Sequence, residues 1–386
     1  MQIGYIHIGK EQQSRVMQML KRLTEPGALD EIGIGRIRDA FADRLFPGTS
    51  TLQKHAKYFS LMPQLYQRAA SRKYNRLSEV QTEIIRLEKK MTEILWRDSN
   101  HASGITGSEM IERPGDSFVK YDPAYIYNSG LRTFEIVRCK SVHQAIYNLS
   151  KKLHNKPETF KSNDEETAND AEELTGSIQP WDVPLNIEYD FLKECPLELS
   201  PADKAFIRKK MLTAPASQGT LLSYLLEHPG VRRLDEFPWL MSEDLPSNLR
   251  QLYDDAIAFS EFVYLLRLRY YYLYSHKEDD KVLETFNNQL EYVRGRNYDM
   301  PAILDSSGSY HESTRNFCLS SFNAAMNDNL EELDSLITRR ERQLKGSRSK
   351  IGTDGYSGNG AARLNYRWET VGVYLDELRE SEVSHG

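Results

Sequence analysis

Residues 32–63 read IGIGRIRDAFADRLFPGTSTLQKHAKYFSLMP, and this stretch predicts two helices joined by a four-residue turn. Asp30 is placed to cap the first helix. The Pro-Gly pair at 47–48 ends it, because proline interrupts the hydrogen-bond ladder and glycine permits a reversal of the chain. Ser50 and Gln53 match the S-x-x-Q capping box, which predicts that a second helix opens there.

Two lysines distinguish the second of these helices. Lys54 and Lys57 fall outside its apolar stripe and are predicted to point into solvent. A helix, a tight turn and a second helix with exposed lysines are typical of a helix-turn-helix DNA-binding element. The alternative is ordinary packing, since two helices joined by a Pro-Gly turn are common in α-rich domains. The predicted DNA contacts of this head are Arg36, Arg38, Ser50, Thr51, Lys54, His55 and Lys57.

Positive charge is concentrated in the part of the chain that carries this pattern. The whole chain has a formal net charge of −6, yet residues 1–152 contain 24 Lys+Arg against 16 Asp+Glu. Residues 155–199 contain 3 against 12. A polyanion would therefore be attracted to the first part of an otherwise acidic protein, which favours nucleic acid as a partner.

The predicted fold class is mainly α, with a helix-turn-helix-like N-terminal head, a small β element and a helical C-terminal domain. Residues 3–8 alternate as a strand does, and residues 11–23 form a helical pattern that completes the head. Over residues 77–94, apolar residues recur every three or four positions, as in a helix packed along its length. Packing within the chain is favoured over a dimer, because fewer than three heptads are present. Residues 104–137 are a candidate for a small hairpin or a winged element.

An acidic segment divides the sequence. Residues 155–184 are poor in apolar residues, and seven acids lie between Glu158 and Glu173, a composition that cannot offset its own ordering entropy. We therefore expect a basic N-terminal domain at 1–154, a flexible linker at 155–185 and a helical domain at 186–386. In the alternative, the acidic segment covers the basic head as a mimic of nucleic acid.

The helical C-terminal domain contains a second group of cations. Helices are predicted to begin at Ser200-Pro201 and to cover about 217–226, 247–276, 312–326, 329–344 and 366–381. Six cations at the end of the 329–344 helix precede a glycine-rich loop at 352–360 and suit phosphate binding: Arg339, Arg340, Arg342, Lys345, Arg348 and Lys350. Alternatively, they balance the helix dipole and pair with Glu331 and Glu332. For the tyrosines of the 247–276 helix, core packing is favoured over a base-stacking platform.

The sequence contains no complete catalytic motif. There is no G-x-x-x-x-G-K-[ST] nucleotide-binding motif, and His154-Asn155-Lys156 lacks the aspartate that follows H-x-K in phospholipase-D-like nucleases. Glu88-Lys89-Lys90 has the E-x-K spacing of restriction nucleases, but it lies in the heptad helix, where surface charge is the favoured interpretation. No metal and no cofactor is predicted from the scattered histidines and three cysteines. The absence of a signal peptide or an uncharged apolar span predicts a cytoplasmic location.

Four blocks of the sequence resemble those of an uncharacterised bacterial family of unknown function. Beside residues 33–63 they are GITGSEMIERPGDSFVKYDPAYIYNSGL at 104–131, LITRRERQLKGSRSKI at 336–351 and LNYRWETVGVYLDEL at 364–378. The resemblance implies no activity and no catalytic residue. It does imply a genomic setting in phage-defence islands, beside helicases, methyltransferases and phospholipase-D-like nucleases. Relatives often have tryptophan at the place of Asn128 and arginines at Lys54 and Lys57, so a bidentate contact from arginine to guanine is not expected here.

Together these patterns predict a DNA-binding recognition or adaptor subunit of a bacterial defence or DNA-processing complex. Its expected partners are double-stranded DNA and helicase, nuclease or methyltransferase subunits, with no membrane contact. One alternative is a metal-dependent nuclease built from dispersed carboxylates, and the other is a scaffold that binds only other subunits. DNA retardation with steep salt dependence, Mg²⁺-dependent cleavage, or neither would distinguish the three.

Overall fold

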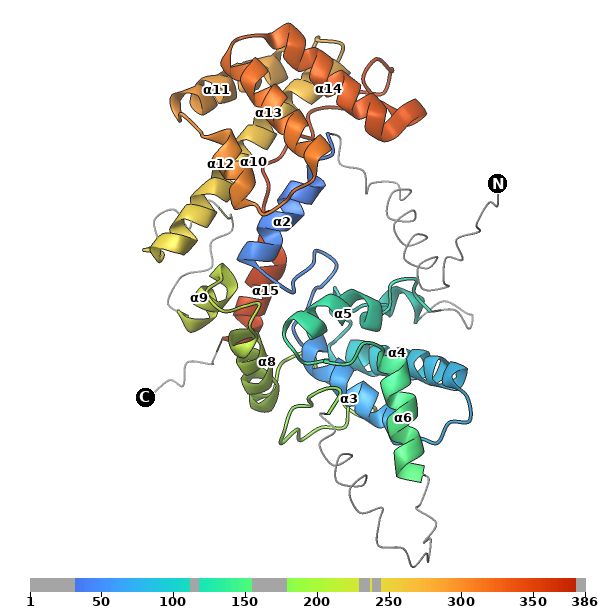
Figure 1. Ribbon diagram of the computed structural model, residues 1–386. Helices are drawn as coiled ribbons and strands as arrows, with labels where there is room; N and C mark the ends of the chain where they lie inside the picture. The colour runs from blue at the N-terminus through green and yellow to red at the C-terminus, as the bar shows by residue number, and fades with distance from the viewer. Residues whose placement is uncertain (1–31, 112–117, 155–178, 229–236, 238–243, 380–386) are drawn as a thin grey trace, which may run out of the picture. The chain divides into compact units, whose positions relative to one another are not determined.

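Helices make up almost all of the regular structure in the described part of the chain. The structure is a computed structural model of the 386-residue protein, and it describes residues 32–111, 118–154, 179–228, 237 and 244–379 (Figure 1). The mainly α fold class is confirmed for these residues. The predicted strand at 3–8 and helix at 11–23 lie outside them. The β structure found within them is an isolated antiparallel bridge between Val137 and Trp181.

The chain forms two compact units, each built from two separate stretches of sequence. The first unit comprises residues 1–44 and 244–366, and the second comprises residues 45–243 and 367–386. These units differ from the predicted domains, because segments on both sides of the acidic segment belong to the second unit. Residues 155–178 of the predicted linker lie outside the described residues.

The first unit is organised around one long helix. This helix, α10 (Ser247–Tyr274), packs against α11 (Asp280–Gly295), α12 (Met300–Ser306) and α14 (Leu330–Lys345), while α13 (Glu312–Met326) packs on α12 and α14. Apolar residues on every face of α10 explain its burial. The predicted helices at 247–276, 312–326 and 329–344 are confirmed. Helix α2 (Gly35–Leu45) adds Phe41, whose ring centroid lies 5.7 Å from that of Phe259 in α10.

The second unit is organised around α3 (Tyr58–Ala70). Helices α4 (Leu77–Asp98), α5 (Pro123–Thr133), α6 (Val142–His154) and α8 (Pro201–Thr213) pack against it, and α9 (Leu221–Glu227) and α15 (Trp368–Leu378) pack on α8. The Phe59 ring lies 5.2–5.7 Å from three other aromatic rings, those of Tyr127, Phe134 and Tyr374. This aromatic cluster is the centre of the unit's core.

Two helix predictions in the second unit are confirmed and one β prediction is wrong. Five of the six predicted heptad residues of α4 are buried and only the first, Leu77, is exposed, so the stripe packs within the chain. At the start of α8, the Ser200 hydroxyl accepts a hydrogen bond from the Asp203 N–H at 3.2 Å and Pro201 follows in the first turn. The described residues of 104–137 form no hairpin or wing. Instead, Asp122 caps α5 by accepting a hydrogen bond from the Tyr125 N–H at 2.8 Å.

The helix-turn-helix geometry is not confirmed. No helix begins at Ser50; the backbone is irregular from the end of α2 to Tyr58, where α3 begins. The Gln53 amide is used in tertiary contacts instead of a capping box, since its Nε2 donates to the Gly48 carbonyl at 3.3 Å and its Oε1 accepts from the Tyr374 hydroxyl at 2.9 Å. The connection between α2 and α3 is therefore much longer than the predicted four-residue turn.

The described end of the predicted linker is packed onto the second unit. Trp181 is buried, and its ring centroid lies 5.8 Å from that of Tyr66. Asp182 accepts two hydrogen bonds from the Arg138 guanidinium, at 2.6 and 2.8 Å, and is also paired with Lys210. These two cations outweigh burial and lower the pKa of Asp182 to about 2. The buried Trp181 side chain and the ion-paired Asp182 carboxylate therefore fix residues that were predicted, from composition, to belong to a flexible linker.

Candidate functional site

Lys57, predicted as a DNA contact, lies in the core of the second unit. Its ammonium donates to Asp203 Oδ2 at 2.8 Å and to the Glu198 carbonyl at 3.1 Å, and the Lys57 and Asp203 side chains both have 0% exposure. The ammonium also lies 4.3 Å from the centroid of the Tyr189 ring. The prediction of an exposed Lys57 is wrong. Helix α3 begins at Tyr58, one residue after Lys57, and the segment before it is not helical, so the helical spacing that predicted exposure does not apply there.

The other residues of the predicted head are divided between the two units. Arg36 is exposed and the Arg38 guanidinium pairs with Asp39 at 2.9 Å in the first unit, whereas residues 50–57 belong to the second unit. Thr51 and Lys54 are exposed, and Ser50 Oγ accepts a hydrogen bond from the Leu52 N–H at 3.3 Å. The predicted head set therefore contains residues from two compact units and a buried lysine.

His55 is a member of the structural framework of the second unit. Its Nδ1 lies 2.7 Å from Glu377 Oε1, and its Nε2 lies 3.0 Å from the Ser103 carbonyl oxygen. Burial lowers the pKa of His55, but Glu377 and the Ser103 carbonyl raise it by more, so the net shift is upward. These contacts link His55 to α15. Both nitrogen atoms of its ring therefore have partners within the protein, and no DNA contact is needed to account for this side chain.

The cations at the end of α14 divide into structural and exposed members. Arg340 is buried in the first unit, where its guanidinium donates to the Ile32 and Gly33 carbonyls at 3.2 and 3.1 Å. Its Nη1 also donates to the Ser313 hydroxyl at 2.9 Å, and its Nη2 to the Thr314 hydroxyl at 3.0 Å. Arg340 is thus a packing residue. In contrast, the side chains of Arg339, Arg342, Arg348 and Lys350 are exposed.

Glu341, which the sequence did not single out, organises the backbone that follows α14. This fully buried carboxylate accepts hydrogen bonds from two hydroxyl groups, two backbone N–H groups and one ammonium, at 2.7–3.2 Å; the donors are Tyr270, Ser349, Lys350, Ile351 and Lys345. Burial raises the pKa of Glu341, but these donors lower it by more. Lys345 therefore has an internal partner, while the Arg342 and Arg348 side chains have no hydrogen-bond or ion-pair partner within the described residues.

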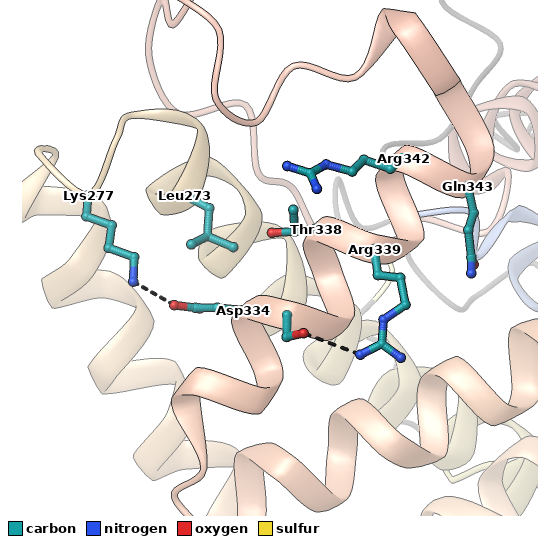
Figure 2. Close-up of a pocket in the computed structure, with 8 residues that line it drawn as sticks. Leu273, Lys277, Asp334, Thr338, Arg339, Arg342 and Gln343 are labelled. Atoms are coloured by element: carbon teal, nitrogen blue, oxygen red, sulfur yellow. Dashed lines mark hydrogen bonds and ion pairs between the residues drawn. The ribbon is translucent and has the colours of Figure 1, made fainter.

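Two of these exposed cations, Arg339 and Arg342, border a surface hollow of about 620 Å³. Figure 2 shows Arg339 and Arg342 extending from α14, with Thr338 and Gln343 beside them and Lys277 on the opposite side. Asp334, the acid in the hollow, is already paired with Lys277 at 2.8 Å and with Arg269 at 2.6 Å. The hollow therefore offers two arginine guanidiniums, the hydroxyls of Ser335 and Thr338 and an amide, a donor set that suits phosphate or carboxylate oxygens.

The glycine loop after α14 is docked on α10. A Cβ added at Gly360 would lie 2.4 Å from the Tyr271 hydroxyl, and one at Gly355 would lie 2.8 Å from the Tyr274 hydroxyl. The Tyr356 hydroxyl also bonds Asp279 at 2.5 Å. The glycines thus permit close contact with tyrosine side chains. Tyr270 is fully buried with its hydroxyl on Glu341, which agrees with the core-packing interpretation for the α10 tyrosines.

Glu88, from the E-x-K sequence, is buried in the second unit and not part of its surface. Its Oε1 accepts a hydrogen bond from the Ala124 N–H at 2.7 Å, whereas Oε2 has no partner among the described residues. Burial, and then the charge of Asp122, raise the pKa of Glu88 well above its ordinary value. Elsewhere in the described ranges too, no group of three or more His, Cys, Asp or Glu side chains is placed to hold a metal ion.

Glu88→Gln is expected to stabilise the protein at neutral pH. The pKa of Glu88 is raised in the folded state, so the unfolded chain ionises above about pH 4.5 while the folded carboxyl keeps its proton, and stability falls as pH rises. Glutamine removes this cost and keeps an acceptor for the Ala124 N–H. The melting temperature of the variant should exceed that of the wild type at pH 8 and approach it at pH 4. Equal melting temperatures at both pH values would contradict a protonated Glu88.

The observed fold and surface define a class of protein, an α-helical protein of two units with a cationic hollow on the first. None of the helices in the described ranges is long and apolar enough to cross a bilayer. A family model, the family of unknown function DUF6361, matches residues 1–285, and the chain belongs to this family. The matched range includes the first two resembling blocks but not those at 336–351 and 364–378. No significant match to the chain was found among curated proteins or solved structures.

Sequence periodicity could have located part of the hollow. Asp334, Thr338 and Arg342 are spaced by four residues and therefore share one face of α14. Counting cations alone could not separate Arg340, which is buried, from the exposed Arg339. Lys277 follows α10 and lies 57 residues from Asp334, so its place in the hollow depends on the tertiary fold.

Proposed function

We propose that this protein binds double-stranded DNA through the exposed cations at the end of α14, as a recognition or adaptor subunit. The observation that supports this proposal is the pair of exposed guanidiniums, Arg342 and Arg348, without internal partners in the described structure. Arg339 and Lys350 add two further exposed positive charges. Guanidinium groups fit phosphate oxygens in a bidentate manner, and such contacts release counterions from DNA.

The charge of the hollow agrees with a polyanionic ligand. Asp334 is neutralised by its pairs with Lys277 and Arg269, and the carboxylate of Glu341 is turned inward. Positive charge therefore remains at the surface after internal pairing. The wider role, membership of a defence or DNA-processing complex with helicase, nuclease or methyltransferase subunits, is the setting that the family resemblance implies.

Replacing Arg342 and Arg348 together with glutamine is expected to weaken binding to duplex DNA in a salt-dependent manner. The slope of log affinity against log salt should fall by about 0.9 for each phosphate contact that is lost. Thermal stability should change little, because exposed positions without partners tolerate polar substitution. Fluorescence anisotropy with the full chain over a salt series measures both affinity and slope.

The matched control replaces Lys281 and Arg296, two other exposed cations of the first unit, with glutamine. This variant has the same net charge as the test variant, so a general charge effect would be equal in both. Equal slopes in test and control variants would overturn the assignment to the α14 surface. Absence of DNA binding by the wild-type chain would overturn the DNA-binding function and leave the scaffold alternative.

A further inference from the structure

The second unit has its own cationic surface, where the end of α6 lies along the turn between α3 and α4 (Figure 1). The Tyr147 hydroxyl of α6 donates to the Asn75 carbonyl at 3.1 Å, and the Ser150 hydroxyl donates to the Arg72 carbonyl. These two contacts make α6 antiparallel to residues 72–75. Cations from two distant segments are therefore brought to one corner of the unit.

Four cations of this corner are exposed and have no acidic partner in the described structure. Lys73 and Arg76 lie in the turn, and Lys151 and Lys152 lie in the last turn of α6. We call these four residues the corner cations. The Lys151 ammonium lies 4.6 Å from the centroid of the Tyr147 ring, a contact that orients the side chain without neutralising it.

The acids beside the corner already have internal partners. Glu83 of α4 is paired with Arg72 at 2.6 Å and with Arg86 at 2.8 Å, two arginines for one carboxylate. Glu79 accepts a hydrogen bond from the Asn75 N–H at 2.9 Å and thus fixes the turn. Among the described residues, the four corner cations together with Arg72 and Arg86 face these two acids, so this part of the surface carries an excess of positive charge.

We infer that the corner cations form a second nucleic-acid surface that binds the phosphodiester backbone of duplex DNA. The surface lies on a different unit from the α14 cations and uses different residues. This inference depends on the proposed function only in that DNA is the ligand in both. Unneutralised lysines and arginines on helical elements would contact phosphates without reading bases, so binding at this surface should be independent of sequence.

This surface also accounts for part of the charge pattern of the sequence. Residues 1–152 contain 24 Lys+Arg, and the four corner cations with Arg72 and Arg86 are six of them. Few apolar side chains are exposed beside them; the large ones are Leu77 and Leu153, which flank the cations in sequence. The exposed side chains of the corner are therefore mainly positively charged. Such a surface favours binding of a phosphodiester backbone over binding of an apolar partner.

The test replaces the four corner cations together with glutamine in the full chain. Its control replaces Lys90, Lys140, Lys193 and Lys209, four exposed lysines elsewhere on the second unit, so that net charge is matched. We expect the affinity for a short fluorescent duplex to fall at least about tenfold at low salt and the salt slope to fall by about 0.9 for each lost contact. The control variant should bind nearly as the wild type does.

Two outcomes would overturn the inference. The first is equal affinity and equal salt slope in the corner and control variants. The second is a loss of binding to phosphatidylserine vesicles with no loss of DNA binding, which would assign the corner to a membrane. If the fourfold variant does not fold, the pairs K73Q/R76Q and K151Q/K152Q are measured separately, and each should show part of the effect. If the corner variant loses DNA affinity as expected but the Arg342/Arg348 variant does not, the α14 site is refuted and the inference about the corner cations stands.

Discussion

Replacing Lys57 with methionine is expected to destabilise the protein by about 3–5 kcal/mol, the usual cost of removing one partner from a buried ion pair. Both side chains of the Lys57–Asp203 pair have 0% exposure, so water cannot replace the lost ammonium. Asp203 would keep its hydrogen bonds from Ser60 and Ser200 but would lose its only described cation. Chemical denaturation monitored by circular dichroism measures the change.

The Lys57 result has a clear control and a pH signature. Lys54→Met, at an exposed position three residues away, should change stability by no more than about 0.5 kcal/mol. Burial raises the pKa of Asp203, but Lys57 and the hydroxyl groups lower it by more, and the net shift is downward. The stability that this carboxylate contributes is therefore present above about pH 4 and is lost as pH falls through the lowered pKa. A wild-type-like K57M variant would refute the buried pair.

Replacing Glu341 with glutamine is expected to destabilise the first unit and loosen residues 346–351. Both carboxylate oxygens accept hydrogen bonds, and an amide would place a donor against at least two other donors. Each buried donor left without an acceptor costs about 1–3 kcal/mol. Differential scanning calorimetry measures the loss, and hydrogen exchange at the Lys350 and Ile351 amides reports the local loosening.

The control for Glu341 is Glu331→Gln, at an exposed position in the first turn of the same helix. It should cost well under 1 kcal/mol, because only a favourable charge near the helix N-terminus is lost. Unchanged protection of the Lys350 and Ile351 amides in E341Q would contradict the role given to this carboxylate. If Arg348 and Lys350 bind DNA, E341Q should also lower DNA affinity, since their backbone would no longer be held.

Local patterns predicted several of the helices and failed where a residue's role depends on a distant partner. The heptad stripe of α4 and the Ser200-Pro201 start of α8 are properties of neighbouring residues, and both predictions are confirmed. Lys57 looked exposed because its partner Asp203 lies 146 residues away. The Ser50–Gln53 pattern matched a capping box, but its glutamine contacts Tyr374, which is 321 residues distant.

The sequence predicted which cations lie at the end of α14, but not which of them are exposed. The sequence placed six cations at the end of α14, and four of them are exposed. Only the fold separates these from Arg340, which binds carbonyl groups of residues 32 and 33, and from Lys345, which pairs with Glu341. The corner cations were contained in the basic N-terminal count, but their grouping required the contact of α6 with the turn after α3.

The interleaved order of the two units has a consequence for experiments on fragments. Helices α8 and α15 follow the acidic segment in sequence, yet α8 packs against α3 and α15 packs against α8, all within the second unit. A single cut between residues 154 and 179 would leave each half with part of one shared core. The halves should therefore stay together on a sizing column until denaturant is added, and neither half expressed alone is a sound substitute for the intact chain.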